Sequence, residues 1–74
     1  MSYYSEAEKK NIGSNLEKYR EKANLTIADM SVKIGTSLNH ISAIEKGVTK
    51  CDAAILKYYA ETCKVSADVL LGII

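Results

Sequence analysis

The side chains that most often carry chemistry are few in this sequence. A chain of 74 residues has one histidine, His40, and two cysteines, Cys51 and Cys63. Their spacing is not that of a zinc site, and no Cys–His pair has a third group to orient it. No glycine-rich phosphate loop is present. We therefore expect no enzyme activity, no metal and no cofactor.

The stretch from Lys33 to Lys50 offers a different chemistry, the binding of an anion. It carries Lys33, Lys46 and Lys50 against Glu45 alone, and His40 can add charge. The whole chain has a net charge of +1, so the overall balance favours no class of partner. Binding to a nucleic-acid backbone needs a local positive patch rather than a basic protein. Such a patch is available only in the middle of the chain.

Helices are predicted to position these residues. Ile12, Leu16 and Tyr19 fall on one face of a first helix. Residues 1–11 are expected to be an N-terminal extension, in which Ser5 and Glu8 could start that helix early. Four more helices are indicated by residues that commonly cap a helix N-terminus, namely Thr26, Ser37, Asp52 and Ser66. Since no segment alternates with period two, residues 12–72 are expected to form a compact all-α domain of five helices.

The segments 26–34 and 37–46, joined at Gly35, have the sequence form of a helix-turn-helix. From Ile12 to Gly72 the chain resembles the Cro/repressor-type helix-turn-helix domain, also called the XRE family. The resemblance is carried by IGSNLEKYREKANLTIADMSVKIGTSLNHISAIEKG and ILKYYAETCKVSADVLLG. It implies a lambda-repressor-like fold. It also implies a sequence-specific regulator of transcription that binds double-stranded DNA, with repressor as the expected role and a bacterium or phage as the source.

The resemblance implies that the third helix enters the major groove. The matching base-contacting positions are Ser37, Leu38, Asn39, Ser42 and Ala43. Asn39 is the best base reader, because an amide can bond adenine bidentately. The alternative for Asn39 is an ordinary solvated residue. Leu38 could contact a thymine methyl group or lie partly in the core.

Phosphate contacts are expected around this helix, at Thr26, His40, Lys46 and Lys50. Helix N-termini attract anions, and the loop 47–50 offers backbone amides. His40 could instead pack against the protein. At the position after Thr26 the family often has a glutamine that bonds the DNA backbone, whereas this chain has Ile27, which cannot.

The family also has an arginine in the first helix that pairs with a glutamate before the closing glycine. Arg20 and Glu45 occupy these positions. A bidentate pair would tie the first helix to the end of the third. The alternative is that both are ordinary surface charges.

A second function class is a helix-turn-helix scaffold that serves as a protein–protein interaction module without DNA binding. Ile27, Leu38 and Ala43 would then form its apolar contact patch. The two functions can be distinguished by one measurement. A DNA-binding regulator binds duplex DNA in a salt-dependent manner, whereas the protein–protein interaction module does not bind DNA.

A homodimer would double the contacts with DNA and read two half-sites. Its interface is expected at Leu71, Ile73 and Ile74, unless the last two isoleucines fold back on the domain. Tyr3 and Tyr4 are a second apolar candidate.

The remaining features concern the compartment. No run is long and apolar enough to cross a membrane, and the first residues lack the apolar core of a signal peptide. We therefore expect a cytoplasmic protein with reduced thiols.

Cys63 is expected in the core and Cys51 in a loop beside the DNA-binding surface, as a plain thiol rather than a redox sensor. The chain has no room for a ligand domain, so no small-molecule ligand is expected.

Overall fold

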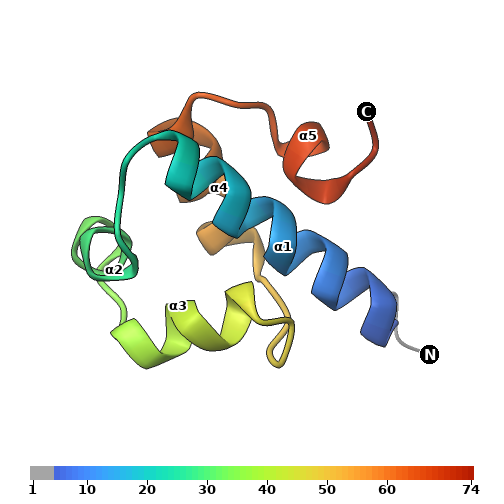
Figure 1. Cartoon of the computed structure of the whole chain (residues 1–74), viewed down its shortest axis with the longest axis horizontal. Coiled ribbons are helices and arrows are strands. Elements are labelled where there is room, and N and C mark those ends of the chain that lie inside the picture. The colour runs from blue at the N-terminus through green and yellow to red at the C-terminus, as the bar shows by residue number, and fades with distance from the viewer. Residues whose placement is uncertain (1–4) are drawn as a thin grey trace.

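The computed structural model describes residues 5–74 as five helices joined by short turns (Figure 1). They are α1 (Glu6–Lys22), α2 (Ile27–Ile34), α3 (Leu38–Glu45), α4 (Ala53–Cys63) and α5 (Ala67–Leu71). This part of the chain contains no strand. The predicted all-α fold of five helices is therefore confirmed. The apolar candidates Tyr3 and Tyr4 lie outside the described residues.

Each helix begins where a short polar side chain can accept a hydrogen bond from the amide three residues further on. The five N-caps are Ser5, Thr26, Ser37, Asp52 and Ser66. Because Ser5 caps α1, residues 6–11 are already helical and continue directly into the domain.

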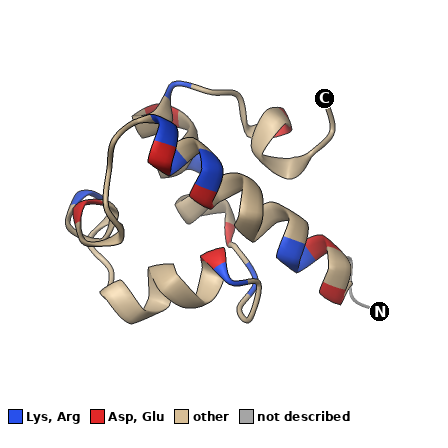
Figure 2. Ribbon diagram, in the orientation of Figure 1, with Lys and Arg blue, Asp and Glu red and all other residues tan. Residues whose placement is uncertain are grey.

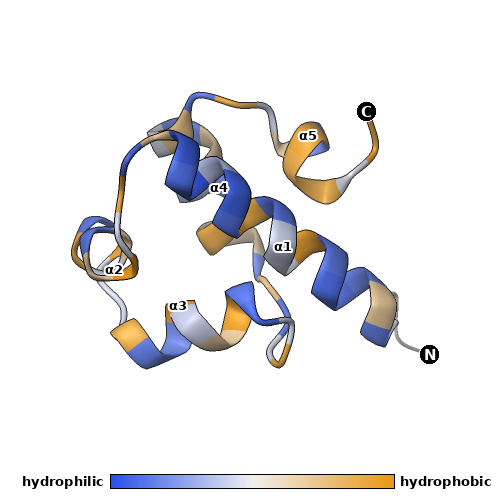
Figure 3. Ribbon diagram, in the orientation of Figure 1, coloured by the Kyte–Doolittle hydropathy of each residue, from blue (hydrophilic) through white to orange (hydrophobic). Residues whose placement is uncertain are grey.

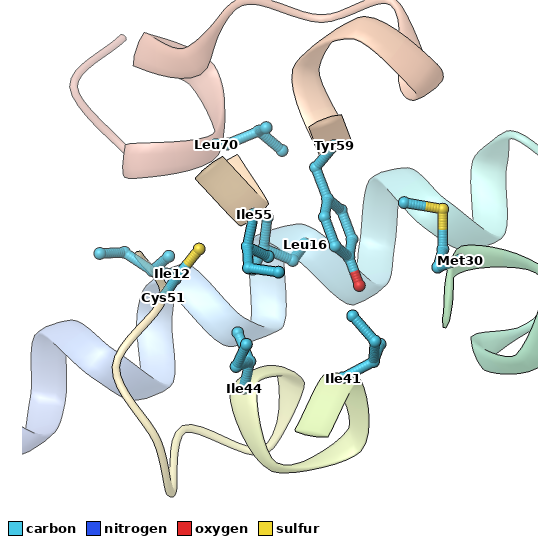
Figure 4. Close-up of a cluster of buried hydrophobic side chains, with 9 residues drawn as sticks. All are labelled: Ile12, Leu16, Met30, Ile41, Ile44, Cys51, Ile55, Tyr59 and Leu70. Carbon is cyan, nitrogen blue, oxygen red and sulfur yellow. The ribbon is translucent and has the colours of Figure 1, made fainter. Parts of the chain in front are cut away.

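The core lies between α1 and the other helices. α1 contacts α3, α4 and α5, while α2 contacts α3. Nine buried side chains from all five helices and one loop meet there (Figure 4), namely Ile12, Leu16, Met30, Ile41, Ile44, Cys51, Ile55, Tyr59 and Leu70. Hydrophobic and hydrophilic residues are interspersed along α1 and α3 (Figure 3), as expected for helices with one buried face.

α1 and α3 approach each other most closely at Gly13. A Cβ atom on Gly13 would lie 2.5 Å from the carbonyl oxygens of both Ile44 and Glu45. Glycine has low helix propensity and weakens the middle of α1. In return, its missing side chain lets the α1 backbone rest directly on the last turn of α3. This contact sets how α3 lies on the rest of the domain.

Candidate nucleic-acid interface

The turn between α2 and α3 depends on Gly35. Its φ angle is +82°, a conformation that residues with a side chain rarely adopt. A Cβ atom there would meet nothing within 4 Å, so the requirement for glycine is the backbone conformation and not the space. Ser37 follows and starts α3, because its hydroxyl oxygen accepts a hydrogen bond of 3.1 Å from the amide of His40.

The last residue of α3 is held by a buried ion pair. The Arg20 Nε atom lies 2.8 Å from Glu45 Oε2, and Arg20 Nη2 lies 3.0 Å from Glu45 Oε1. Both residues are only 6% exposed. The hydrogen bond to Glu45 raises the pKa of Arg20 above its ordinary value. The structure thus brings together two side chains that are 25 positions apart in the sequence.

Two further groups complete this pair. Arg20 Nη1 donates a hydrogen bond of 2.7 Å to the carbonyl oxygen of Leu25, just before α2. The Tyr59 hydroxyl of α4 donates to Glu45 Oε2 at 2.5 Å. We call Arg20, Leu25, Glu45 and Tyr59 the buried network. It fixes the end of α1, the start of α2 and the end of α3 relative to α4.

Tyr59 is a member of this network that the sequence patterns did not single out. Its ring is fully buried, and burial together with the hydrogen bond to Glu45 raises the pKa of its hydroxyl. A buried tyrosine usually finds a partner for its hydroxyl. This rule could have indicated that the Tyr59 hydroxyl has a hydrogen-bond partner, although it does not identify Glu45 as that partner.

The opposite face of α3 is open. Ile41 and Ile44 are buried, whereas Ser37 and Asn39 are exposed and Leu38 is 48% exposed. α3 itself carries no Lys or Arg (Figure 2), and the first basic residue after it is its C-cap, Lys46. At its N-terminal end the outward surface of α3 is therefore uncharged, with the polar Ser37 and Asn39 beside the apolar Leu38.

Two of the expected base-contacting residues, Ser42 and Ala43, are half-buried. Directly after α3 the chain turns, because the amides of Val48 and Thr49 donate to the carbonyl oxygen of Ala43 at 3.0 and 3.3 Å. These two residues are thus less open to a partner than Ser37 and Asn39.

The same turn corrects the expectation that the loop 47–50 offers backbone amides to phosphates. The amide of Gly47 donates to Ile44, and those of Val48 and Thr49 donate to Ala43. These three amides already have intramolecular partners, because the chain reverses direction directly after α3. Any anion contact at this loop must come mainly from side chains, and both Lys46 and Lys50 are exposed there.

The start of α2 offers less to an anion than its position implies. The Thr26 amide donates to the Asp29 carboxylate at 2.9 Å, and the Thr26 hydroxyl oxygen accepts from the Asp29 amide at 3.0 Å. These hydrogen bonds lower the pKa of Asp29, so its carboxylate is charged at neutral pH. Asp29 therefore occupies the amide that a phosphate would bind, and Thr26 keeps only its hydroxyl hydrogen for a partner. His40, the remaining candidate, is half-buried.

Ile27, which stands where the family often has glutamine, is half-buried and packs against the core. It is thus not part of an outward apolar patch. Among the residues proposed for that patch, only Leu38 is exposed, and Ala43 is half-buried. Val32 on α2 is 81% exposed, a residue that the sequence patterns did not single out.

The C-terminal residues divide into two groups. Leu71 is half-buried against the core of its own domain. Ile73 and Ile74 are 67% and 80% exposed. A hydrogen bond of 3.1 Å from Asn15 to the carbonyl oxygen of Leu70 attaches α5 to α1. The apolar surface at this end is therefore made by the last two isoleucines.

Cys51 lies in the core and not at the surface expected for it. It is 6% exposed and lies near Ile12 and Ile55 (Figure 4). Burial raises the pKa of its thiol to about 12, which disfavours the reactive thiolate. Cys63 is half-buried against the core. We assign neither thiol a redox role.

Residues 5–74 bring no three metal-binding side chains together. Within the same residues, no helix has both the length and the apolar character needed to cross a membrane.

Comparisons with known proteins agree with this geometry. A family model described as a helix-turn-helix domain matches residues 13–72. Two uncharacterized HTH-type transcriptional regulators of Mycobacterium tuberculosis, from strains CDC 1551 and H37Rv, are each 33% identical over 58 residues. The match covers 78% of this chain and 41% of each relative, so the chain spans about two fifths of their length. The chain belongs to the Cro/repressor-type helix-turn-helix family.

Proposed function

We propose that this domain binds double-stranded DNA in a sequence-specific manner and regulates transcription as a repressor in the cytoplasm. The observation that carries the proposal is the contrast within α3. Its inner face is fixed by the core and by Glu45 of the buried network, while its N-terminal outer face is exposed. A helix held in this way can enter a major groove without changing its own packing. The related proteins are named as regulators of transcription, which supports the same role.

Base contacts are proposed for the exposed start of α3. Asn39 presents an amide that can bond adenine, and Leu38 can contact a thymine methyl group. Ser37 already accepts one hydrogen bond as N-cap, and its hydroxyl hydrogen remains available to donate to a base. The half-buried Ser42 and Ala43 would contribute only where the groove wall approaches closely.

Phosphate contacts are proposed for Lys46, Lys50 and His40, with the Thr26 hydroxyl as a fourth donor. They carry no sequence information, but they set the orientation of the helix on the duplex. Since few of them are charged, one domain is expected to bind with modest affinity.

A homodimer would compensate for this modest affinity. We infer that Ile73 and Ile74 of two copies meet, because these are exposed apolar side chains at one end of the domain. Replacement of both by serine should lower the apparent mass in sedimentation equilibrium to that of a single chain. A wild-type mass that already equals one chain would rule out this dimer.

The experiment for the function itself is selection of bound duplexes from a random pool, followed by titration of the best duplex at several salt concentrations. The proposal expects one enriched motif and an affinity that falls as salt rises. No binding to any duplex at low salt would leave the alternative function, a protein–protein interaction module. The exposed Val32 and Leu38 are the observation in favour of that alternative.

A further inference from the structure

The N-terminal half of α1 lies directly against the loop that follows α3. A Cβ atom on Gly47 would lie 2.7 Å from the Cα atom of Lys10 and 2.8 Å from its Cγ atom. The side chain of Lys10 therefore starts directly beside Gly47. Gly47 follows Lys46 in the sequence and lies three residues before Lys50. Figure 2 shows the basic residues near the start of α1 beside those of this loop. The fold thus adds a third lysine to a region where the sequence places two.

The charge of Lys10 is available to an external partner. Its neighbour Lys9 forms an ion pair of 2.9 Å with Glu6, and the Lys9 side chain is 20% exposed. Neither of the two ion pairs found within residues 5–74 involves Lys10, which is itself exposed. Glu45, the acidic residue closest in sequence to this loop on the α3 side, is buried against Arg20. Its charge is therefore balanced inside the domain.

This loop must attract an anion with side chains, because the amides of Gly47, Val48 and Thr49 are used within the protein. We propose that Lys10 binds a DNA backbone phosphate together with Lys46 and Lys50. We call these three residues the lysine edge. The proposal rests on the DNA-binding function proposed above and extends the interface to α1, a helix outside the helix-turn-helix.

A lysine binds phosphate as a point charge, so Lys10 supplies affinity and not base preference. It also brings a second element to the DNA backbone. Because α1 rests on α3 at Gly13 and on the loop at Gly47, a phosphate bound at the lysine edge fixes the angle of the whole domain on the duplex.

The test compares Lys10→Ala with Lys22→Ala. Both remove one exposed lysine from α1, but Lys22 lies about 18 Å further along the helix axis. Each protein is titrated with the selected duplex and with an unrelated duplex over a range of salt concentrations. Lys10→Ala should reduce the slope of log affinity against log salt by about 0.9. It should also weaken binding to both duplexes on the order of tenfold at about 50 mM salt. Lys22→Ala should behave as wild type, and Lys10→Arg should restore the slope.

The outcomes separate the two proposals. Wild-type protein that binds no duplex overturns the proposed function. Wild-type binding with equal behaviour of Lys10→Ala and Lys22→Ala overturns the role of Lys10 and leaves the function standing. A loss limited to the selected duplex also overturns it, because a phosphate contact acts on every sequence alike. Circular dichroism checks that both variants keep the helical content of the wild type.

Discussion

The inner side and the outer side of α3 differ in their contacts with the rest of the domain. On the inner side, Ile41 and Ile44 are buried, Gly13 allows backbone contact with α1, and Glu45 is bonded to two other side chains. On the outer side, Asn39 is exposed and lies outside the buried network. A change inside should therefore cost stability, whereas a change outside should cost only recognition.

This difference fits the role proposed for α3, a recognition helix without arginine. The inner contacts keep α3 in place whatever its outer residues are, so those residues need not contribute to folding. The outer face can then consist of uncharged side chains, such as Ser37, Leu38 and Asn39, that allow close approach to a groove.

The largest effect is expected for Glu45→Ala. The substitution leaves the Arg20 guanidinium buried without its carboxylate and removes the acceptor of the Tyr59 hydroxyl. Removing one partner of a buried pair typically costs about 3–5 kcal/mol. A domain of this size is expected to have roughly 4–11 kcal/mol in total. Urea unfolding followed by circular dichroism measures the loss, with the exposed Glu17→Ala as control. A loss below about 1 kcal/mol, the range of surface pairs, would show that the network does not hold α3.

The next effect is expected for Gly13→Ala. The added methyl group would meet two backbone carbonyl oxygens at 2.5 Å, and backbone atoms cannot move aside as a flexible side chain can. Overpacking of this kind costs about 3 kcal/mol at the upper end of its usual range, although alanine regains about 1 kcal/mol of helix propensity. The control is Ser14→Ala at the neighbouring exposed position. If Gly13→Ala proved as stable as wild type, the close contact of α1 with α3 would be wrong.

Tyr59→Phe should have a smaller effect, because Glu45 Oε2 keeps its hydrogen bond from Arg20. The loss of one hydrogen bond to a charged group corresponds to about 2 kcal/mol. Tyr58→Phe, at the adjacent exposed tyrosine, should change nothing. Equal stabilities of the two variants would remove Tyr59 from the network.

The same variant has a signature in its pH dependence. Burial raises the pKa of Tyr59 above its ordinary value of 10.0, so the folded state holds this proton more tightly than the unfolded state. The stabilisation is complete below about pH 10 and is lost as the pH rises above it. Wild type should therefore lose stability more steeply than Tyr59→Phe at alkaline pH. Cys51, with a pKa raised from 9.0 to about 12, adds a loss of the same sign to both proteins.

The smallest effect on folding is expected for Asn39→Ala on the outer face. Surface substitutions of this type stay within about 0.5 kcal/mol in stability. Duplex selection with this variant should nevertheless show a relaxed preference at one base position, whereas Lys50→Ala should weaken all duplexes alike. Equal losses of both kinds from the two variants would remove Asn39 from the role of base reader.

Local features of this fold could be predicted from the sequence because they depend on neighbouring residues. The caps Thr26 and Ser37 act on amides three residues away, and the stop at Gly35 depends on its own φ angle. The positions of Arg20 and Glu45 follow the pattern of the family over a longer range. These features were sufficient to predict the fold class, but not the partial burial of Ser42 and Ala43 on α3.

The remaining features depend on distant contacts that no local pattern records. The partner of Tyr59 is 14 residues away, and the Leu25 carbonyl that Arg20 binds is a backbone atom without a side-chain signature. Lys10 appeared to belong to an N-terminal extension, because its position beside Gly47 arises only when α1 packs on α3. The hydrogen bonds that the amides of residues 47–49 donate within the protein likewise depend on how the chain turns after Glu45.

The central claim is that the outer face of α3 and the lysine edge bind duplex DNA. Backbone amide NMR spectra of the domain, recorded during titration with the selected duplex at low salt, test it most directly. We expect the largest shift changes within residues 37–43 and 46–50 and near Lys10, and small changes along α4 and α5. Changes confined to α4, α5 and the C-terminal isoleucines, or no change at any duplex concentration, would contradict the account.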